Sequence, residues 1–181
     1  MKNLNKLFYI SILIVTTLAL NSCNPFDELY LTLAMETEFR TEAPVSNVSL
    51  TSSICLSEFD DYNDNSDKLK EIRYISAAYF TLNSSNGLTG DLRLKLYQGN
   101  TNILLFEFTD SNFEADSSLS KPLKINLRQQ EVNNINTYLI NPKVDKCFRA
   151  ELVVLNANDN DGPPFQLNGK VEFLTELQIE P

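Results

Sequence analysis

The chain has 181 residues, of which 43% are hydrophobic and 22% charged, a length and composition typical of one globular domain. This composition excludes a disordered chain, a collagen-like repeat and a polytopic membrane protein. The chain has 15 Lys and Arg against 24 Asp and Glu, a formal net charge of -9, which argues against nucleic acid as a partner because phosphate binding depends on cationic side chains. There is no His, so the commonest general base and the usual zinc ligand are missing.

The first residues have the pattern of an export signal. Lys2 and Lys6 form a basic segment, and the apolar stretch 7–20 follows. This stretch is too short to span a bilayer as a helix, which needs about 20 residues. A basic segment followed by a short apolar one is typical of a signal peptide that is removed from the mature protein.

The segment 20–23, Leu-Asn-Ser-Cys, resembles the lipobox of bacterial lipoproteins, where a Leu lies three residues before a Cys and a small residue directly precedes it. The resemblance implies cleavage after Ser22 and a lipid on Cys23. Asp27 and Glu28 follow, and acids at this place are similar to those of Bacteroidetes lipoproteins, some of which reach the cell surface. The resemblance therefore implies a protein lipid-anchored to the outer membrane, at its periplasmic face or at the cell surface, with the bilayer as its partner. An outer-membrane protein complex is a further expected partner.

These signals divide the chain into a signal peptide at 1–22, a lipidated Cys with a short tether at 23–28, and a single domain at 29–181. Loss of residues 1–22 removes two lysines and no acid, so the mature chain of 159 residues carries 13 basic and 24 acidic side chains, a formal charge of -11. At about 3.4 Å per residue, the tether keeps the domain within roughly 20 Å of the bilayer.

Alternation of apolar and polar residues runs through 29–181 and predicts β-strands. In the first, at 29–40, one face is apolar and the other carries Glu36 and Glu38 as its solvent side. Gly169, inside the last strand, predicts a bulge. The remaining strands are predicted at 46–56, 70–82, 92–96, 103–108, 123–127, 148–154 and 165–179. In 70–82 the apolar face consists of Ile72, Tyr74, Ala78, Phe80 and Leu82.

One stretch departs from this alternation. Val132, Ile135 and Leu139 recur at intervals of three and four residues, which predicts a short crossover helix near 129–140. Seven or eight strands with one helix predict an all-β fold, an antiparallel sandwich of the immunoglobulin-like type. A jelly roll or a small barrel is the alternative.

Two Asn- and Asp-rich segments, 57–68 and 156–162, are candidate calcium loops because Ca²⁺ prefers carboxylate and amide oxygens. Neither has the spacing of an EF-hand, and solvated turns are the favoured interpretation. If the helix near 129–140 carries the chain from one end of the sandwich to the other, both loops return to the anchored end. The acids that would gather there as a weak calcium site are Asp60, Asp61, Asp64, Asp159 and Asp161.

Cys55 and Cys147 remain after lipidation of Cys23, and an oxidising compartment permits a disulfide between them. In a simple immunoglobulin order the two lie at opposite ends of the sandwich, beyond the roughly 6 Å between Cα atoms that a disulfide requires. The topology that gathers the acidic loops therefore excludes the bridge, and the pairing stays open as the less favoured alternative.

No residue pattern supports catalysis, because without His a Ser nucleophile has only Lys or a carboxylate as its base. Tyr62 and Tyr97 lie in or beside loops, where a ring could stack on a sugar, although packing at the core or rim is the commoner role. The sequence thus predicts a non-catalytic, lipid-anchored envelope protein that acts as an accessory or protein-binding module without a cofactor. The alternative is a surface module that binds glycan or calcium.

Overall fold

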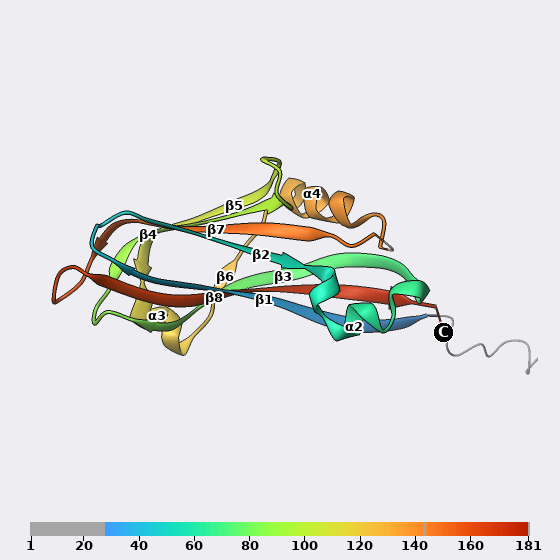
Figure 1. The fold of residues 1–181 in the computed structure, drawn as a ribbon, viewed down its shortest axis with the longest axis horizontal. Coiled ribbons are helices and arrows are strands. Elements are labelled where there is room, and N and C mark those ends of the chain that lie inside the picture. Colours follow the sequence, from blue (N-terminus) through green and yellow to red (C-terminus); the bar gives the residue numbers. More distant parts are fainter. Residues whose placement is uncertain (1–27, 143, 181) are drawn as a thin grey trace, which may run out of the picture.

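The computed structural model describes residues 28–142 and 144–180. Two antiparallel four-stranded sheets pack face to face as a sandwich (Figure 1), one with the order β1-β8-β3-β6 and the other with the order β2-β7-β4-β5. The strands are β1 Leu29–Ala43, β2 Val48–Cys55, β3 Leu69–Ser84, β4 Thr89–Gln98, β5 Leu104–Glu114, β6 Leu123–Ile125, β7 Cys147–Asn158 and β8 Phe165–Ile179. The short helices are η1 Leu56–Glu58, α2 Asp60–Asn63, η2 Ser66–Lys68, α3 Ala115–Ser120 and α4 Gln129–Leu139.

The strands pair by a simple rule: first with last, second with seventh, third with sixth and fourth with fifth. The chain is thus one long hairpin whose pairs alternate between the two sheets, which is a jelly roll. The predicted antiparallel sandwich of seven or eight strands with a short helix near 129–140 is confirmed. The strand order differs from the immunoglobulin-like one, in which the first strand lies beside the second. Here β1 pairs with β8.

The register defines two ends of the sandwich. Leu29 lies opposite Ile179, and Ala43 lies opposite Phe165. Both ends of the described chain therefore lie at one end, which we call the terminal pole, and the turns 44–47, 85–88 and 159–164 lie at the other, which we call the distal pole (Figure 1). At about 3.3 Å per residue, the 15 residues of β1 separate the poles by about 50 Å.

A bulge in β3 exchanges the two faces expected for this strand. Ile75 is an extra residue relative to β8. A shift of one residue moves every following side chain to the opposite face. Tyr79 is therefore fully buried, whereas Phe80 is only partly buried and Leu82 is 43% exposed, so the expectation that both face the core is wrong.

Gly169 makes room for Tyr79. A Cβ atom at Gly169 would lie 2.7 Å from Cζ of the Tyr79 ring, too close for any side chain. The Tyr79 ring packs edge to face on Phe113, with ring centroids 5.7 Å apart. A bulge lies beside Gly169 in the pairing of β3 with β8, but its extra residue is Leu82 of β3, so the prediction of a bulge in the last strand is wrong.

The two long sides of the sandwich are closed differently. On one side, β1 and β2 meet through a hydrogen bond of 2.5 Å between the Thr37 and Ser52 hydroxyls. On the other, β6 is only three residues long, and α4 covers the core with buried Ile135 and Leu139. No helix in the described part of the chain is long and apolar enough to cross a membrane.

Candidate functional site: a disulfide-linked cap and a charged groove

The segment 57–68, expected to be a solvated turn, forms a helical cap together with Leu56 at the terminal pole. Leu56 is fully buried and Tyr62 is 3% exposed. The Tyr62 hydroxyl donates a hydrogen bond of 3.0 Å to the Pro142 carbonyl, and burial raises the pKa of the phenol. Two apolar side chains therefore fasten the segment to the sandwich. The acids of the cap stay exposed on its surface, namely Glu58, Asp60, Asp61, Asp64 and Asp67.

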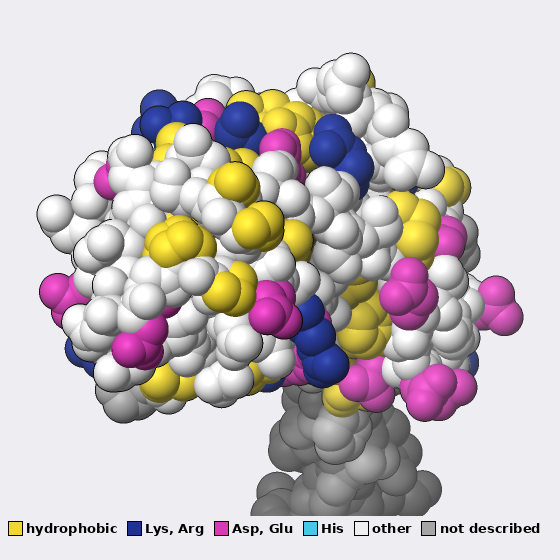
Figure 2. Space-filling view, turned by 60° about the vertical axis from the view of Figure 1, so that its left-hand side comes forward, with side chains coloured by type: hydrophobic (Ala, Val, Ile, Leu, Met, Phe, Trp, Pro, Cys, Tyr) yellow, Lys and Arg dark blue, Asp and Glu magenta, His cyan; other side chains and the backbone are white. Residues whose placement is uncertain are grey.

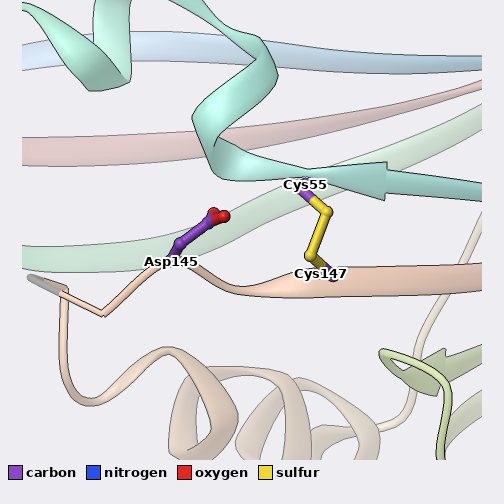
Figure 3. A group of neighbouring side chains, drawn as sticks. All are labelled: Cys55, Asp145 and Cys147. Carbon is purple, nitrogen blue, oxygen red and sulfur yellow. A yellow bond between two sulfur atoms is a disulfide. The ribbon is translucent and has the colours of Figure 1, made fainter.

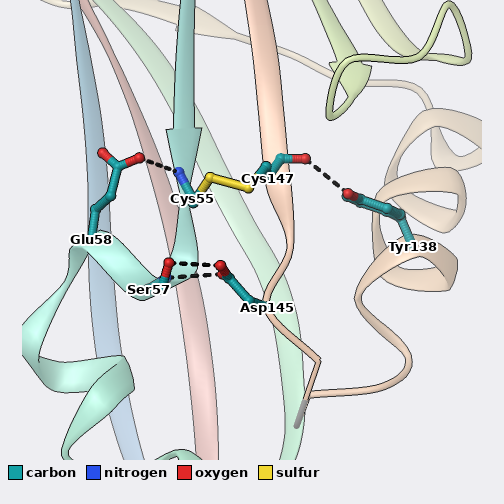
Figure 4. Close-up of a disulfide and its surroundings, with 6 residues drawn as sticks. All are labelled: Cys55, Ser57, Glu58, Tyr138, Asp145 and Cys147. Atoms are coloured by element: carbon teal, nitrogen blue, oxygen red, sulfur yellow. Dashed lines mark hydrogen bonds between the residues drawn. A yellow bond between two sulfur atoms is a disulfide. The ribbon is translucent and has the colours of Figure 1, made fainter.

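A disulfide joins the base of this cap to β7 (Figures 3 and 4). Cys55 ends β2 and lies directly opposite Cys147, which begins β7, with the sulfurs 2.00 Å apart and the Cα atoms 3.9 Å apart. The expectation that topology holds the two cysteines apart is wrong. It assumed an immunoglobulin-like order, whereas in the jelly roll the second strand pairs with the seventh.

Asp145 is a second link between the cap and β7 (Figure 4). Its carboxylate accepts hydrogen bonds from the backbone N–H and the hydroxyl of Ser57, at 3.0 and 2.6 Å. On the other side of the bridge, the Tyr138 hydroxyl of α4 donates to the Cys147 carbonyl at 2.8 Å. The cap, α4 and the start of β7 are thus bonded to one another through side chains.

Asp145 also lies near both sulfur atoms (Figure 3). Within 28–142 and 144–180, Asp145, Cys55 and Cys147 are the one group of three side chains placed closely enough to hold a metal ion. Two of its three donor atoms are bonded to each other, so the disulfide accounts for the cluster.

The second acidic loop lies at the opposite pole. β6 and the residues after it return the chain to the terminal pole before β7 begins, so β7 ends at the distal pole. The prediction that Asp159 and Asp161 join the acids of the cap is therefore wrong, because about 50 Å of strand separates the two groups. The joint calcium site proposed from the sequence does not form.

Asp159 instead builds the turn in which it stands. Its side chain is 9% exposed, and Oδ1 accepts hydrogen bonds from the backbone N–H groups of Asp161, at 3.0 Å, and Gly162, at 2.5 Å. Gly162 has φ of +76°, a conformation that favours glycine. This is an Asx-type turn, in which a short acidic side chain replaces a backbone acceptor.

The two tyrosines considered for sugar stacking do not form a platform. Tyr62 is buried in the cap. Tyr97 lies on the outer face of β4, where the Arg149 guanidinium covers its ring at 3.9 Å from the centroid and its hydroxyl donates to Glu151 at 3.1 Å. One face of this half-buried ring is therefore already occupied.

A groove of about 500 Å³ lies between the end of β5 and the segment 121–124. Asp110 and Glu114 stand along β5, and Lys121 and Lys124 stand along the facing segment. The volume is in the range of ligand-binding clefts. Sequence reasoning missed this site because the two segments become neighbours only through the jelly-roll topology, and the four charges have no distinctive spacing.

No family model and no curated protein matches the sequence. Among solved structures, the chain is similar to turnip yellow mosaic virus, with a TM-score of 0.41, 7% identity and coverage of 84% of this chain and 82% of that one. Tobacco necrosis virus gives a TM-score of 0.41, 10% identity and coverage of 84% and 97%. Desmodium yellow mottle tymovirus gives a TM-score of 0.38 and 10% identity, with coverage of 84% of this chain and 90% of that one. The jelly-roll assignment rests on the strand order itself, and these likenesses carry no argument about function.

Proposed function

We propose that the protein is a lipid-anchored, non-catalytic module of the bacterial outer membrane that binds another protein. The observation that carries the proposal is the position of the first strand. Leu29 opens β1 at the terminal pole, opposite Ile179. A tether from a lipid on Cys23 would therefore join the sandwich at its terminal pole. The sandwich, about 50 Å long, would then extend away from the bilayer.

The distal pole is suited to contact rather than to chemistry. Figure 2 turns this end of the molecule toward the viewer, where hydrophobic and uncharged polar side chains lie among a few charged ones. Val45 in the first distal turn is 57% exposed, and Pro163 and Pro164 in the last are exposed as well. Such a surface offers apolar contact area with a charged rim, which is the usual anatomy of a protein interface.

The anchor is tested by metabolic labelling with an alkyne-tagged fatty acid. The wild-type protein should be labelled and should fractionate with membranes, whereas Cys23→Ala should carry no label. Asn24→Ala, one residue further on, is the matched control and should be labelled like the wild type. Equal labelling of wild type and Cys23→Ala would contradict the proposal that a lipid on Cys23 anchors the protein.

The partner is tested by photo-crosslinking in intact cells, with the crosslinking amino acid placed at Val45 and, as the matched control, at Ile140 near the terminal pole. A single membrane protein crosslinked from the distal position supports the proposal. A long Gly/Ser insertion after Asn24 should weaken this crosslink, because the tether then no longer holds the domain within roughly 20 Å of the bilayer.

A further inference from the structure

The edge of β5 is closed by α4 over part of its length. β5 is the outermost strand of its sheet. The Asn134 side chain donates to the Leu105 carbonyl at 3.5 Å, and the Glu131 carboxylate accepts a hydrogen bond from the backbone of Glu107. Because alternate residues of an antiparallel strand turn their N–H and C=O groups to the same edge, the next outward-facing residue is Thr109.

Beyond Glu107 this edge is open. Among the described residues, the backbone of 108–114 has no backbone partner other than the β4 ladder. The outward N–H and C=O of Thr109 are thus available to a strand from another chain. One extra residue in β5 between Asp110 and Phe113 forms a bulge. The bulge ends the straight edge and limits any added strand to a short segment.

The open edge leads directly into the charged groove. Neither Lys121 nor Lys124 forms an ion pair within the described part of the chain, and both side chains are exposed. The facing wall carries Asp110 and Glu114. Glu114 lies opposite Thr89, at the distal end of the sandwich, so the groove lies away from the terminal pole. A ligand here meets two uncompensated cations on one side and two carboxylates on the other.

We propose that this groove binds an extended segment of a partner protein, which adds to the edge of β5 at Thr109 and passes between the charged walls. In strand addition, main-chain hydrogen bonds supply affinity and alternate side chains supply specificity. An acidic side chain of the segment meets Lys121 and Lys124, and a basic one meets Asp110 and Glu114. The inference rests on the proposed role as a protein-binding module and adds to the distal turns a second binding site, which takes an extended segment of the partner.

The test uses a displayed library of random dodecapeptides, selected on the mature protein purified from whole cells in detergent. Selection should enrich peptides with β-branched residues at alternate positions and at least one Asp or Glu. Lys121→Glu/Lys124→Glu should weaken their binding about tenfold or more, and selection on this variant should enrich basic peptides instead. The matched control, Lys68→Glu/Lys70→Glu at the terminal pole, has the same charge change and should bind like the wild type.

Thr109→Pro removes the outward N–H without breaking a bond of the fold, and should also weaken binding about tenfold if its melting temperature is unchanged. If Thr109→Pro does not fold, the charge reversal at exposed Lys121 and Lys124 still tests whether the groove binds the peptides. The inference is overturned if no peptide is enriched, or if enriched peptides bind the charge-reversed variant equally well. Failure of the proposed function is distinct, since it would appear as absent lipid labelling or an absent membrane crosslink while peptide binding persists.

Discussion

Two segments rich in Asn and Asp lie at opposite poles of this jelly roll and have different structures. The cap at 56–68 is folded onto the sandwich by buried Leu56 and Tyr62 and leaves its acids in solvent. The distal turn at 159–164 differs: Asp159 is buried, whereas Asp161 and both prolines are exposed. Similar composition therefore does not imply similar structure or a shared metal site.

The two segments differ because one must cover the apolar core and the other must supply acceptors for its own backbone N–H groups. The cap follows the disulfide and crosses the end of the sandwich, so apolar side chains are needed to cover the core there. The distal turn joins β7 to β8 over a few residues, and its backbone N–H groups need an acceptor within the turn, which Asp159 supplies. We therefore expect the cap to depend on covalent and apolar links, and the distal turn on one carboxylate.

The largest effect is expected from removal of the bridge. Cys55→Ser/Cys147→Ser should lower the free energy of unfolding by about 2–4 kcal/mol, because the disulfide closes a loop with a sequence separation of 92 residues. Urea unfolding of the mature protein measures the loss. Wild type reduced with dithiothreitol should match the variant, and the variant should not respond to the reductant. An unchanged unfolding midpoint would show that the cap is held without the bridge.

A smaller effect is expected at the distal pole. Asp159→Ala should lower the free energy of unfolding by about 1–3 kcal/mol, because two backbone N–H groups of the turn lose a charged acceptor. Asp159→Asn should cost less, since its amide oxygen can take the place of Oδ1. The matched variant at the cap, Asp60→Ala, should stay within about 0.5 kcal/mol because Asp60 is exposed. Equal losses at the two positions, measured by urea unfolding, would contradict the contrast between the poles.

Alternation predicted the strands well because it depends only on neighbouring residues and on which face is buried. β1 has Leu33, Met35 and Phe39 inside and Glu36 outside, as expected. Alternation failed in β3 at Ile75, because a bulge adds a residue without changing the local composition. Within one chain, periodicity therefore identifies faces until a bulge interrupts it.

Strand pairing was beyond this kind of prediction. The partner of β2 depends on contacts far apart in the sequence, so the approach of Cys55 to Cys147 could not be derived from alternation. The groove depends in the same way on how β5 meets the segment 121–124. The cap had one usable signal in Leu56 and Tyr62, two large apolar residues spaced six apart within an acidic stretch.

The second link of the cap, Asp145, should contribute less than the disulfide. Asp145→Asn should lower the free energy of unfolding by about 1 kcal/mol, because a charged acceptor of two Ser57 hydrogen bonds becomes a neutral one. In the Cys55→Ser/Cys147→Ser background the same change should cost a different amount, since the bridge and Asp145 hold the same segment. A double-mutant cycle by urea unfolding measures the coupling. Strict additivity would mean that the two links act on the cap independently.

The smallest effect is expected in α4, which is followed by the Pro142 carbonyl that Tyr62 of the cap contacts, and it depends on pH. The Glu131 carboxylate accepts hydrogen bonds from the Arg128 guanidinium at 2.7 Å and from the Arg128 backbone N–H at 2.8 Å. The Arg128 side chain is the main reason that the pKa of Glu131 lies below its ordinary value of 4.5. A carboxyl whose pKa is lowered by folding stabilises the fold above its unfolded pKa, and this stabilisation disappears as the pH falls through the folded pKa.

Glu131→Gln should therefore be less stable than the wild type at pH 7, and the gap should narrow steadily below pH 4.5 until the two variants melt together. Arg128→Ala should remove most of the same pH dependence, because it removes the main cause of the lowered pKa. Thermal melts of wild type and both variants between pH 7 and pH 3 measure these gaps. If the gap between wild type and Glu131→Gln stays constant across this range, Glu131 acts at the start of α4 through its shape and hydrogen bonding alone, and its charge contributes nothing to the stability of the fold.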